Sequence, residues 1–472
     1  MKIVFVASEA TPFIKTGGLG DVIGSLPEAL KKEKQECIVI LPNYQDLKSL
    51  ETIEFITSFD VWVGWRKQYC GIFKTQLSGV TFYFIDNQQY FQRSGVYGYD
   101  DDYERFAYFD IAALELIGHL QIQPDIIHLH DWQTAMISVL YKEKYKQFQY
   151  YENIKIIFTI HNIAYQGKAN PMLIDDMFGL SRELYENGNL EHDSCFNMMK
   201  SAIVYSDIIS TVSPTYAKEI LTLEYGEGLE GVLRLRENDI YGIINGINIA
   251  EIYSKTNINI VENYNRRNFY NKKRINKVAL QKEGHLPVNE SPCIGMVTRL
   301  TWQKGIDLVI NQISEIMKLN IQLIILGTGD YDYEQTLLHL QNQYPTKLSF
   351  QQKYDEGLAQ RIYASCDMFL MPSLFEPCGL SQMMAMHYGT IPIVRETGGL
   401  KDSVDTYNEI EKTGTGFGFR NYNAHEMMNI IKMALQVYNN DKPIWKKLMS
   451  STMKVDFSWK QSAKQYLQLY KR

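Results

Sequence analysis

The sequence contains few cysteines, and none of them has the spacing of a metal site. The six lie far apart, with no C-x-x-C pair among them: Cys37, Cys70, Cys195, Cys293, Cys366 and Cys378. This scatter favours a reducing compartment and argues against a structural zinc site. We therefore expect a cytoplasmic protein that binds no metal.

Long apolar segments and an excess of positive charge are also absent. No apolar run reaches the length of a bilayer, and the first one, Ile3–Ala7, is followed by Ser8 and Glu9 rather than by a cleavage region. The formal net charge of -6 argues against a nucleic-acid-binding surface. We expect neither a membrane nor a nucleic acid as a partner.

The rest of the composition is that of a globular protein built on parallel sheets. Hydrophobic residues make up 45% of the 472 residues and charged residues 22%, and this length predicts two domains. Short apolar, β-branched runs alternate with helix-like segments, which is typical of an α/β protein whose sheets are covered by helices on both faces. The predicted strands are Ile3–Ala7, Cys37–Leu41, Ile126–Leu129, Ile156–Ile160, Ile208–Val212, Cys293–Val297, Ile321–Leu326, Met368–Met371 and Ile391–Val394.

Composition places the boundary between the two domains near Asn245-Gly246. The segment that follows, Ile249–Lys277, is rich in Asn, Lys and Arg and poor in apolar runs, so it resembles a connector and a surface helix. In the first half, Val80–Ile85 is expected to belong to an inserted antiparallel piece. The last helix, Trp459–Tyr470, could pack on either domain.

A glycine loop, Lys15–Asp21, follows the first predicted strand directly. A strand, a glycine turn and a helix start present backbone N–H groups to a phosphate, because glycine permits close approach and the helix dipole favours negative charge. Lys15 adds a cation beside Gly17 and Gly18. The loop is neither a Walker A loop nor a complete G-x-G-x-x-G motif, so a simple turn that caps the strand is the alternative.

A second loop of the same kind lies in the other half of the chain. The predicted strand Ile391–Val394 leads through Arg395-Glu396-Thr397 to Gly398-Gly399-Leu400, and a helix-like segment follows. Two α/β domains that face each other across a cleft would explain why each half carries a Gly-Gly-Leu turn.

Polar residues collect after the predicted strands, where open parallel sheets bind their ligands. Arg299 and Lys304 follow one strand; Arg offers a two-pronged donor and Lys a point charge to a diphosphate leaving group. Glu376 follows another strand, where its carboxylate could accept hydrogen bonds from two vicinal sugar hydroxyls. Asp131 and His161 follow strands of the first half.

Each of these five residues also has an ordinary structural interpretation. Arg299 and Lys304 could be solvated surface cations, and Glu376 could be an acidic residue that serves a helix dipole. Asp131 could form an Asx-type turn, and His161 could be a hydrogen-bonded core histidine. The residues alone leave these alternatives open.

Taken together, these segments closely resemble the bacterial glycogen synthase and plant starch synthase family. The resemblance extends over almost the whole chain, and so many motifs in the family's order are very specific. The matching segments are KTGGLGDV at 15–22, HLHDWQTAM at 128–136, TIHNIAYQG at 159–167, TVSPTYAKEI at 211–220, GIINGIN at 242–248, TRLTWQKG at 298–305, FEPCGLSQMMAMHYGTIPIVRETGGLKDSV at 375–404 and DFSW at 456–459.

The resemblance implies two Rossmann-like domains of the GT-B fold, residues 1–245 on the glucan side and 246–455 on the nucleotide-sugar side. The tail, 456–472, is expected to cross back to the first domain as a helix. The implied reaction transfers glucose from a nucleotide sugar, chiefly ADP-glucose, to the non-reducing 4-hydroxyl of an α-1,4-glucan such as glycogen or starch. The anomeric configuration is retained, and no metal or other cofactor is expected.

The resemblance also implies roles for individual residues on the donor side. Arg299 and Lys304 bind the diphosphate, with Lys15 and Gly18 from the other domain, and Glu376 holds the glucose being transferred. Tyr354 is expected to stack on the adenine. The other residues expected to bind substrate are Gly17, Asp21, Cys378, Gly379, Leu380, Gly398 and Gly399.

The remaining implied roles belong to the first domain. His161 and Asp131 line the sugar pocket, with Asn245 nearby, and Glu9 and Tyr97 lie toward the acceptor glucan.

The sequence departs from the family pattern at three places. Many related retaining enzymes carry a second glutamate eight positions after the first, and here that position is Met384, which puts the basis of nucleotide choice in doubt. Lys200-Ser201-Ala202 and Asn248 are the other departures, and neither belongs to the expected diphosphate site.

Other functions fit the sequence less well. An NAD-dependent oxidoreductase would need G-x-G-x-x-G and an acidic ribose ligand about 20 residues further on, and neither is present. A glucan phosphorylase would need a lysine for pyridoxal phosphate, which is not identifiable. The main alternatives are a glucan-binding protein without activity and a glucosyltransferase that uses UDP-glucose.

Overall fold

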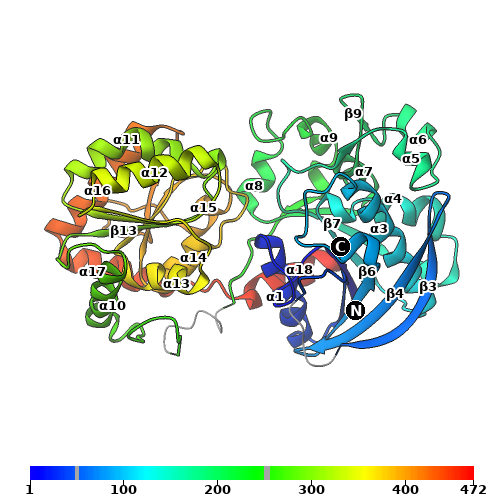
Figure 1. The fold of residues 1–472 in the computed structure, drawn as a ribbon, viewed down its shortest axis with the longest axis horizontal. Helices are drawn as coiled ribbons and strands as arrows, with labels where there is room; N and C mark the ends of the chain where they lie inside the picture. Colours follow the sequence, from blue (N-terminus) through cyan, green and yellow to red (C-terminus); the bar gives the residue numbers. More distant parts are fainter. Residues whose placement is uncertain (48–52, 249–255) are drawn as a thin grey trace. The chain divides into compact units, whose positions relative to one another are not determined.

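The computed structural model describes residues 1–47, 53–248 and 256–472. The chain forms two compact units, one made of Met1–Gly246 with Trp459–Arg472 and the other of Ile247–Ser458. Figure 1 shows that each unit is a sheet covered by helices. The start of the connector expected after residue 246, at 249–255, lies outside the described residues.

The sheet of the first unit has nine strands, in the order β12-β11-β7-β6-β1-β2-β5-β4-β3. Its central strands are continuous apolar runs that are almost wholly buried, as expected for strands covered on both faces. Neighbouring strands from β12 to β5 pair in parallel. The strands are β1 (Lys2–Val6), β2 (Glu36–Pro42), β3 (Glu54–Val63), β4 (Arg66–Leu77), β5 (Val80–Asp86), β6 (Ile126–His130), β7 (Lys155–Ile160), β11 (Ile208–Thr211) and β12 (Ile240–Gly242).

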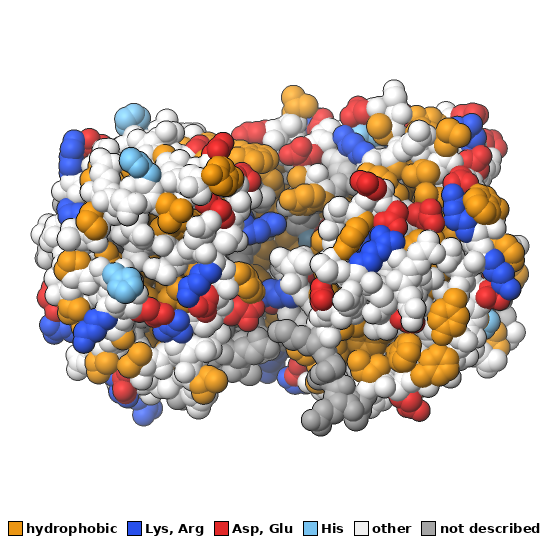
Figure 2. All heavy atoms as spheres, in the orientation of Figure 1, with side chains coloured by type: hydrophobic (Ala, Val, Ile, Leu, Met, Phe, Trp, Pro, Cys, Tyr) orange, Lys and Arg blue, Asp and Glu red, His pale blue; other side chains and the backbone are white. Residues whose placement is uncertain are grey.

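The antiparallel insertion is larger than predicted. β5 pairs in parallel with β2 and antiparallel with β4, and β3 and β4 extend the sheet as a long hairpin. One face of this hairpin is uncovered, and Figure 2 shows hydrophobic side chains on this part of the unit. Phe55, Trp62, Trp65 and Tyr69 are between 49% and 74% exposed.

Helices cover both faces of this sheet. The α-helices of more than four residues in the first unit are α1 (Gly18–Lys32), α3 (Asp102–His119), α4 (Met136–Leu140), α7 (Met198–Tyr205), α8 (Pro214–Glu219), α9 (Glu230–Leu235) and α18 (Trp459–Tyr470). Helix α1 begins at the glycine loop, buries Val22, Ile23, Leu26 and Leu30 along one side, and ends in two lysines that suit the negative end of its dipole.

The last helix, α18, belongs to the first unit. Trp459, Ala463 and Tyr466 belong to the same buried apolar cluster as the residues of β1 and α1, and Figure 1 shows α18 in red beside α1 in blue. The Tyr470 hydroxyl lies 2.9 Å from Nδ1 of His128 on β6. The C-terminal tail is therefore part of the first unit's core.

The second unit has a six-stranded parallel sheet in the order β15-β14-β13-β16-β17-β18. Its strands are β13 (Cys293–Val297), β14 (Gln322–Leu326), β15 (Leu348–Gln351), β16 (Met368–Met371), β17 (Ile391–Arg395) and β18 (Phe417–Phe419). Its helices are α10 (Phe269–Glu283), α11 (Ile306–Lys318), α12 (Tyr331–Gln343), α13 (Glu356–Ser365), α14 (Ser381–His387), α15 (Gly398–Ser403), α16 (Ala424–Asn440) and α17 (Lys442–Thr452).

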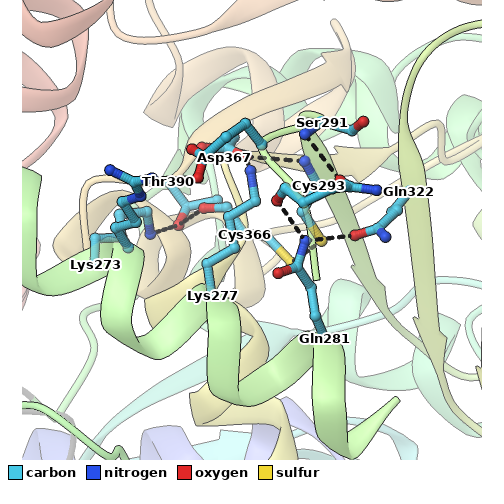
Figure 3. A network of polar contacts seen from close by, with 12 residues as sticks. Lys273, Lys277, Gln281, Ser291, Cys293, Gln322, Cys366, Asp367 and Thr390 are labelled. Atoms are coloured by element: carbon cyan, nitrogen blue, oxygen red, sulfur yellow. Dashed lines mark hydrogen bonds and ion pairs between the residues drawn. The ribbon is translucent and has the colours of Figure 1, made fainter. Parts of the chain in front are cut away.

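A polar stripe on α10 ties the amino ends of these strands together, as Figure 3 shows. Lys277 forms a 2.7 Å ion pair with Asp367, which precedes β16 and also accepts a hydrogen bond from the Cys293 amide at the start of β13. Gln281 donates to Gln322 on β14. Lys273 donates to carbonyls at the ends of α13 and α14. This stripe therefore connects the strands at their amino ends, whereas the candidate site lies beyond their carboxyl ends.

In the described ranges, no helix is both long enough and apolar enough to cross a bilayer.

Candidate active site

The first glycine loop has open space beside Gly17 and Gly18. The N-cap of α1 is Gly17, with no side-chain hydrogen bond capping the helix, and nothing lies within 4 Å of the position that a Cβ would take on Gly17 or Gly18. Lys15 is held beside the loop by an ion pair of 2.8 Å to Asp21. The loop thus has the open space and the cation that a phosphate group requires.

Glu9 lies beneath this loop and shapes it. Its buried carboxylate accepts hydrogen bonds from the Thr16 amide, from the Thr16 hydroxyl at 2.9 Å and from the Gly17 amide at 3.2 Å. The Tyr97 hydroxyl donates to the same carboxylate at 2.9 Å. Glu9 and Tyr97, the two residues predicted to face the acceptor glucan, are therefore hydrogen-bonded to each other, and Glu9 also holds the glycine loop in place.

Asp131 has a strained backbone at the carboxyl end of β6. Its φ of 57° and ψ of -176° fall in a region that side chains other than glycine rarely adopt, and such strain concentrates at functional sites. Its carboxylate accepts a 2.8 Å hydrogen bond from the His161 amide beyond β7. Burial raises the pKa of Asp131 to about 7, partly offset by the backbone hydrogen bonds it accepts.

His161 is held from two sides. Its backbone is bonded to Asp131, and its Nε2 lies 2.9 Å from Nδ1 of the fully buried His130. Burial lowers the pKa of His161 to about 3, so the ring is neutral at physiological pH. The structure therefore brings Asp131 and His161 into direct contact.

Asn245 adds a polar group with unused bonding capacity. The residue is 3% exposed, and its Oδ1 finds no hydrogen-bond partner among the described residues. A buried polar atom without a partner costs stability and calls for an explanation such as ligand binding.

In the second unit, Arg299 lies just beyond β13 and is exposed. No residue that the structure describes forms a hydrogen bond or ion pair with its guanidinium group. Its charge is accordingly available to an anion from outside the chain.

Lys304 and Glu376 form a close pair beyond the ends of β13 and β16. The Lys304 ammonium lies 2.8 and 2.7 Å from the two carboxylate oxygens of Glu376. The Ser373 hydroxyl donates to the same carboxylate at 3.0 Å. Sequence reasoning gave these two residues separate tasks and did not anticipate their contact.

The second glycine turn packs closely against the loop that bears Glu376. A Cβ on Gly398 would lie 2.0 Å from the Glu376 carbonyl oxygen, and one on Gly399 would lie 2.0 Å from that of Cys378. The Gly399 amide donates to the Glu376 carbonyl at 3.1 Å. This turn therefore differs from the first, because its space is filled by the chain's own backbone.

The remaining predicted residues lie near these groups or stand apart from them. Gly379 and Leu380 lead from the Glu376 loop into α14, and Cys378 is buried beside Gly399. Tyr354 is 77% exposed after β15, and its hydroxyl donates to Glu356 at 2.6 Å.

Sequence reasoning missed several residues that hold the site in place. His130, Gln303, Ser373 and Arg395 all contact predicted site residues or their loops. His130 and Arg395 end strands β6 and β17; both follow predicted strands in the sequence, where neither was given a role. Within the described residues, no group of His, Cys, Asp or Glu is arranged to hold a metal ion.

Both halves of the chain match families of known function. Residues 2–235 match the family described as the starch synthase catalytic domain, and residues 278–443 match glycosyl transferases group 1. The glycogen synthase of Clostridium beijerinckii is 50% identical over 475 residues, covering 100% of this chain and 99% of the relative. That of Streptococcus mutans is 48% identical over 474 residues, with coverage of 100% and 99%.

Solved structures agree with these matches. The catalytic domain of starch synthase IV from Arabidopsis thaliana, bound to ADP and acarbose, aligns with a TM-score of 0.93 and 35% identity, covering 100% of this chain and 99% of that one. Sucrose-phosphate synthase from Thermosynechococcus elongatus aligns with a TM-score of 0.61 and 16% identity, covering 100% and 98%, and supports the fold alone. The chain has the GT-B fold with two Rossmann-like domains, and it belongs to the glycogen synthase family of glycosyltransferases.

Proposed function

We propose that this enzyme transfers glucose from ADP-glucose to the non-reducing end of an α-1,4-glucan and releases ADP. The observation that carries the proposal is the group beyond β13 and β16, where the open cation Arg299 lies in one loop with Lys304, which contacts Glu376. A diphosphate leaving group needs cations, and a glucosyl group needs a fixed acceptor of hydrogen bonds. Membership of the glycogen synthase family supports the same reaction.

On the donor side, Arg299 and Lys304 of the second unit bind the diphosphate, and the loop with Lys15 and Gly18 in the first unit is a phosphate-binding loop. The open guanidinium of Arg299 and the open space at Gly18 support these roles. The exposed ring of Tyr354 stacks on the adenine. As the bond between C1 of glucose and the phosphate oxygen breaks, charge grows on the diphosphate, and the two cations stabilise it.

On the sugar side, Glu376 of the second unit accepts hydrogen bonds from glucose hydroxyls. Within the first unit, Asp131, His161 and Asn245 form a sugar-binding group. The unpartnered Oδ1 of Asn245 and the strained backbone of Asp131 support this placement. Glu9 and Tyr97 affect binding of the acceptor glucan mainly by holding the glycine loop at 15–21 in place.

Retention of configuration is part of the proposal. The 4-hydroxyl oxygen of the glucan forms its bond to C1 on the face that the diphosphate leaves, and its proton passes to the departing phosphate oxygen. Proton NMR of the anomeric signals of the newly formed linkages tests this step. A newly formed β-linkage would contradict retention.

The test of the overall reaction is incorporation of labelled glucose into glycogen. We expect rapid incorporation from ADP-glucose and much slower incorporation from UDP-glucose. Faster incorporation from UDP-glucose would show that UDP-glucose is the donor. The comparison matters because position 384 is Met in this chain, where many related retaining enzymes carry a glutamate. Glycogen binding without incorporation from either donor would instead assign a non-catalytic glucan-binding protein.

A further inference from the structure

Arg395 is a buried cation at the carboxyl end of β17, and it contacts the loop that carries Glu376. The residue is 6% exposed. Its Nη1 donates to the Leu374 carbonyl and lies 3.5 Å from the Ser373 carbonyl, while its Nε donates to the Arg420 carbonyl at 3.1 Å. The guanidinium group thus joins two separate backbone segments.

The loop itself, residues 372–380, has no helix or strand but is mostly buried. Buried backbone groups outside regular structure must find partners elsewhere. The Leu374 amide donates to the Gln303 carbonyl at 2.9 Å, and the Gln303 side chain donates to the Phe375 carbonyl at 3.3 Å. Arg395 supplies the only charged donor that these contacts include, and hydrogen bonds from charged donors are the stronger ones.

A short chain of contacts leads from Arg395 to the Glu376 carboxylate. Arg395 fixes the carbonyls of Ser373 and Leu374, and the Ser373 hydroxyl donates to Glu376 at 3.0 Å. A shift of this backbone would move both the Ser373 hydroxyl and the carboxylate relative to the Lys304 ammonium. Misplacement of a reacting group by about 1 Å can cost about 100-fold in rate.

We propose that Arg395 is a positioning residue for glucosyl transfer and that it acts through Glu376. This role rests on the proposed function, in which Glu376 holds the transferred glucose. The planar guanidinium reaches two segments in a fixed geometry, whereas a lysine ammonium is a point charge on a flexible stem. We therefore expect the shape of the arginine side chain, and not only its positive charge, to keep the loop that carries Glu376 in place.

The test is a double-mutant cycle between Arg395→Met and Glu376→Gln, with Arg395→Lys as the conservative variant. We expect Arg395→Met to lower kcat on the order of tenfold or more in the wild-type background, with Arg395→Lys in between. In the Glu376→Gln background, Arg395→Met should lower kcat little further. The Kd for ADP should change far less than kcat in all of these variants.

Arg420→Met is the matched control, because the Arg420 side chain is 87% exposed and its ion pair with Glu396 is long, at 3.5 Å. It should leave kcat unchanged. If Arg395→Met does not fold, the cycle is run with Arg395→Lys. Equal loss of kcat in both backgrounds, or a parallel loss of ADP affinity, would overturn the role while glucose transfer by the wild type stands. A wild type that transfers no glucose would overturn the proposed function and this role together.

Discussion

Lys304 and Glu376 neutralise each other in a largely buried pair. The Lys304 ammonium lies 2.7 Å from the nearer carboxylate oxygen, and the two side chains are 15% and 7% exposed. The residues are 72 positions apart in the sequence and come from the loops beyond β13 and β16. An anionic ligand that approaches Lys304 therefore competes with Glu376 for the ammonium, so a change in either residue alters both.

Glu376→Gln should lower kcat by about 100-fold or more while ADP binds at least as tightly as to the wild type. The amide keeps the volume but loses the charge-assisted hydrogen bonds to the sugar. The same change leaves the Lys304 ammonium without its counter-charge, which favours an added anion. Turnover assays and calorimetric ADP titration of one preparation measure both quantities.

Glu315→Gln is the control for this prediction, since Glu315 is an exposed residue that pairs with Lys318 on the surface of α11. It should change neither quantity. If ADP affinity fell together with kcat in Glu376→Gln, Glu376 would belong to the nucleotide site instead.

Arg299→Ala should lower kcat/KM because it raises the activation free energy by about 3–4 kcal/mol, the effect of removing one donor to a developing anion. The melting temperature should stay within a degree or so, because the side chain is exposed and forms no hydrogen bond or ion pair with the described residues. Arg267→Ala, at another exposed arginine of the same unit, serves as the control. Near-normal turnover in Arg299→Ala would remove this residue from the diphosphate site.

The sequence predicted the central strands well and the edge strands poorly, for a physical reason. Central strands are buried on both faces and read as continuous apolar runs, so the predicted Cys293–Val297 and Met368–Met371 match β13 and β16. Strands β3, β12, β15 and β18 lie at sheet edges, and none was predicted. Their short or half-polar sequences, such as LSFQ in β15, lack that pattern.

The sequence could propose the residues of the candidate site but not the contacts among them. Position at a strand end and family resemblance together nominated Asp131, His161, Arg299 and Glu376, and the structure confirms only that they lie beyond strand ends. The pairing of Lys304 with Glu376 depends on how two loops approach each other, which no local pattern encodes. The same holds for Glu9, whose bonds to the glycine loop form only after the chain turns back on itself.

The two glycine turns should respond differently to alanine. Gly18→Ala adds a methyl group to open space, so the melting temperature should hold while ADP binds about tenfold more weakly, or about 1.4 kcal/mol. Gly399→Ala places a methyl group 2.0 Å from a backbone oxygen, so it should destabilise the fold by about 1–3 kcal/mol. Thermal unfolding and ADP titration of both variants separate the two effects. Equal behaviour of the two would show that the turns serve one purpose.

The buried Lys273 should make stability depend on pH. Burial lowers its pKa from 10.5 to about 7 in the folded protein. Below pH 7 both the folded and the unfolded chain carry the proton, so the penalty for burying the charge is constant. Between pH 7 and 10.5 only the unfolded chain keeps the proton, so the free energy of unfolding should rise with pH by about 1.4 kcal/mol per unit from this group.

The measurement compares the unfolding free energies of wild type and Lys273→Met in denaturant between pH 6 and 10. The contributions of tyrosines and cysteines that titrate in this range are the same in both proteins and cancel in the difference. We expect the difference in unfolding free energy, wild type minus variant, to grow as the pH rises above about 7 and to be flat below it. Lys282→Met, at an exposed position of the same helix, should show no such slope. A difference that stayed constant across the whole range would mean that Lys273 keeps its proton in the fold, held by the carbonyls of Tyr363, Ala364 and Tyr388.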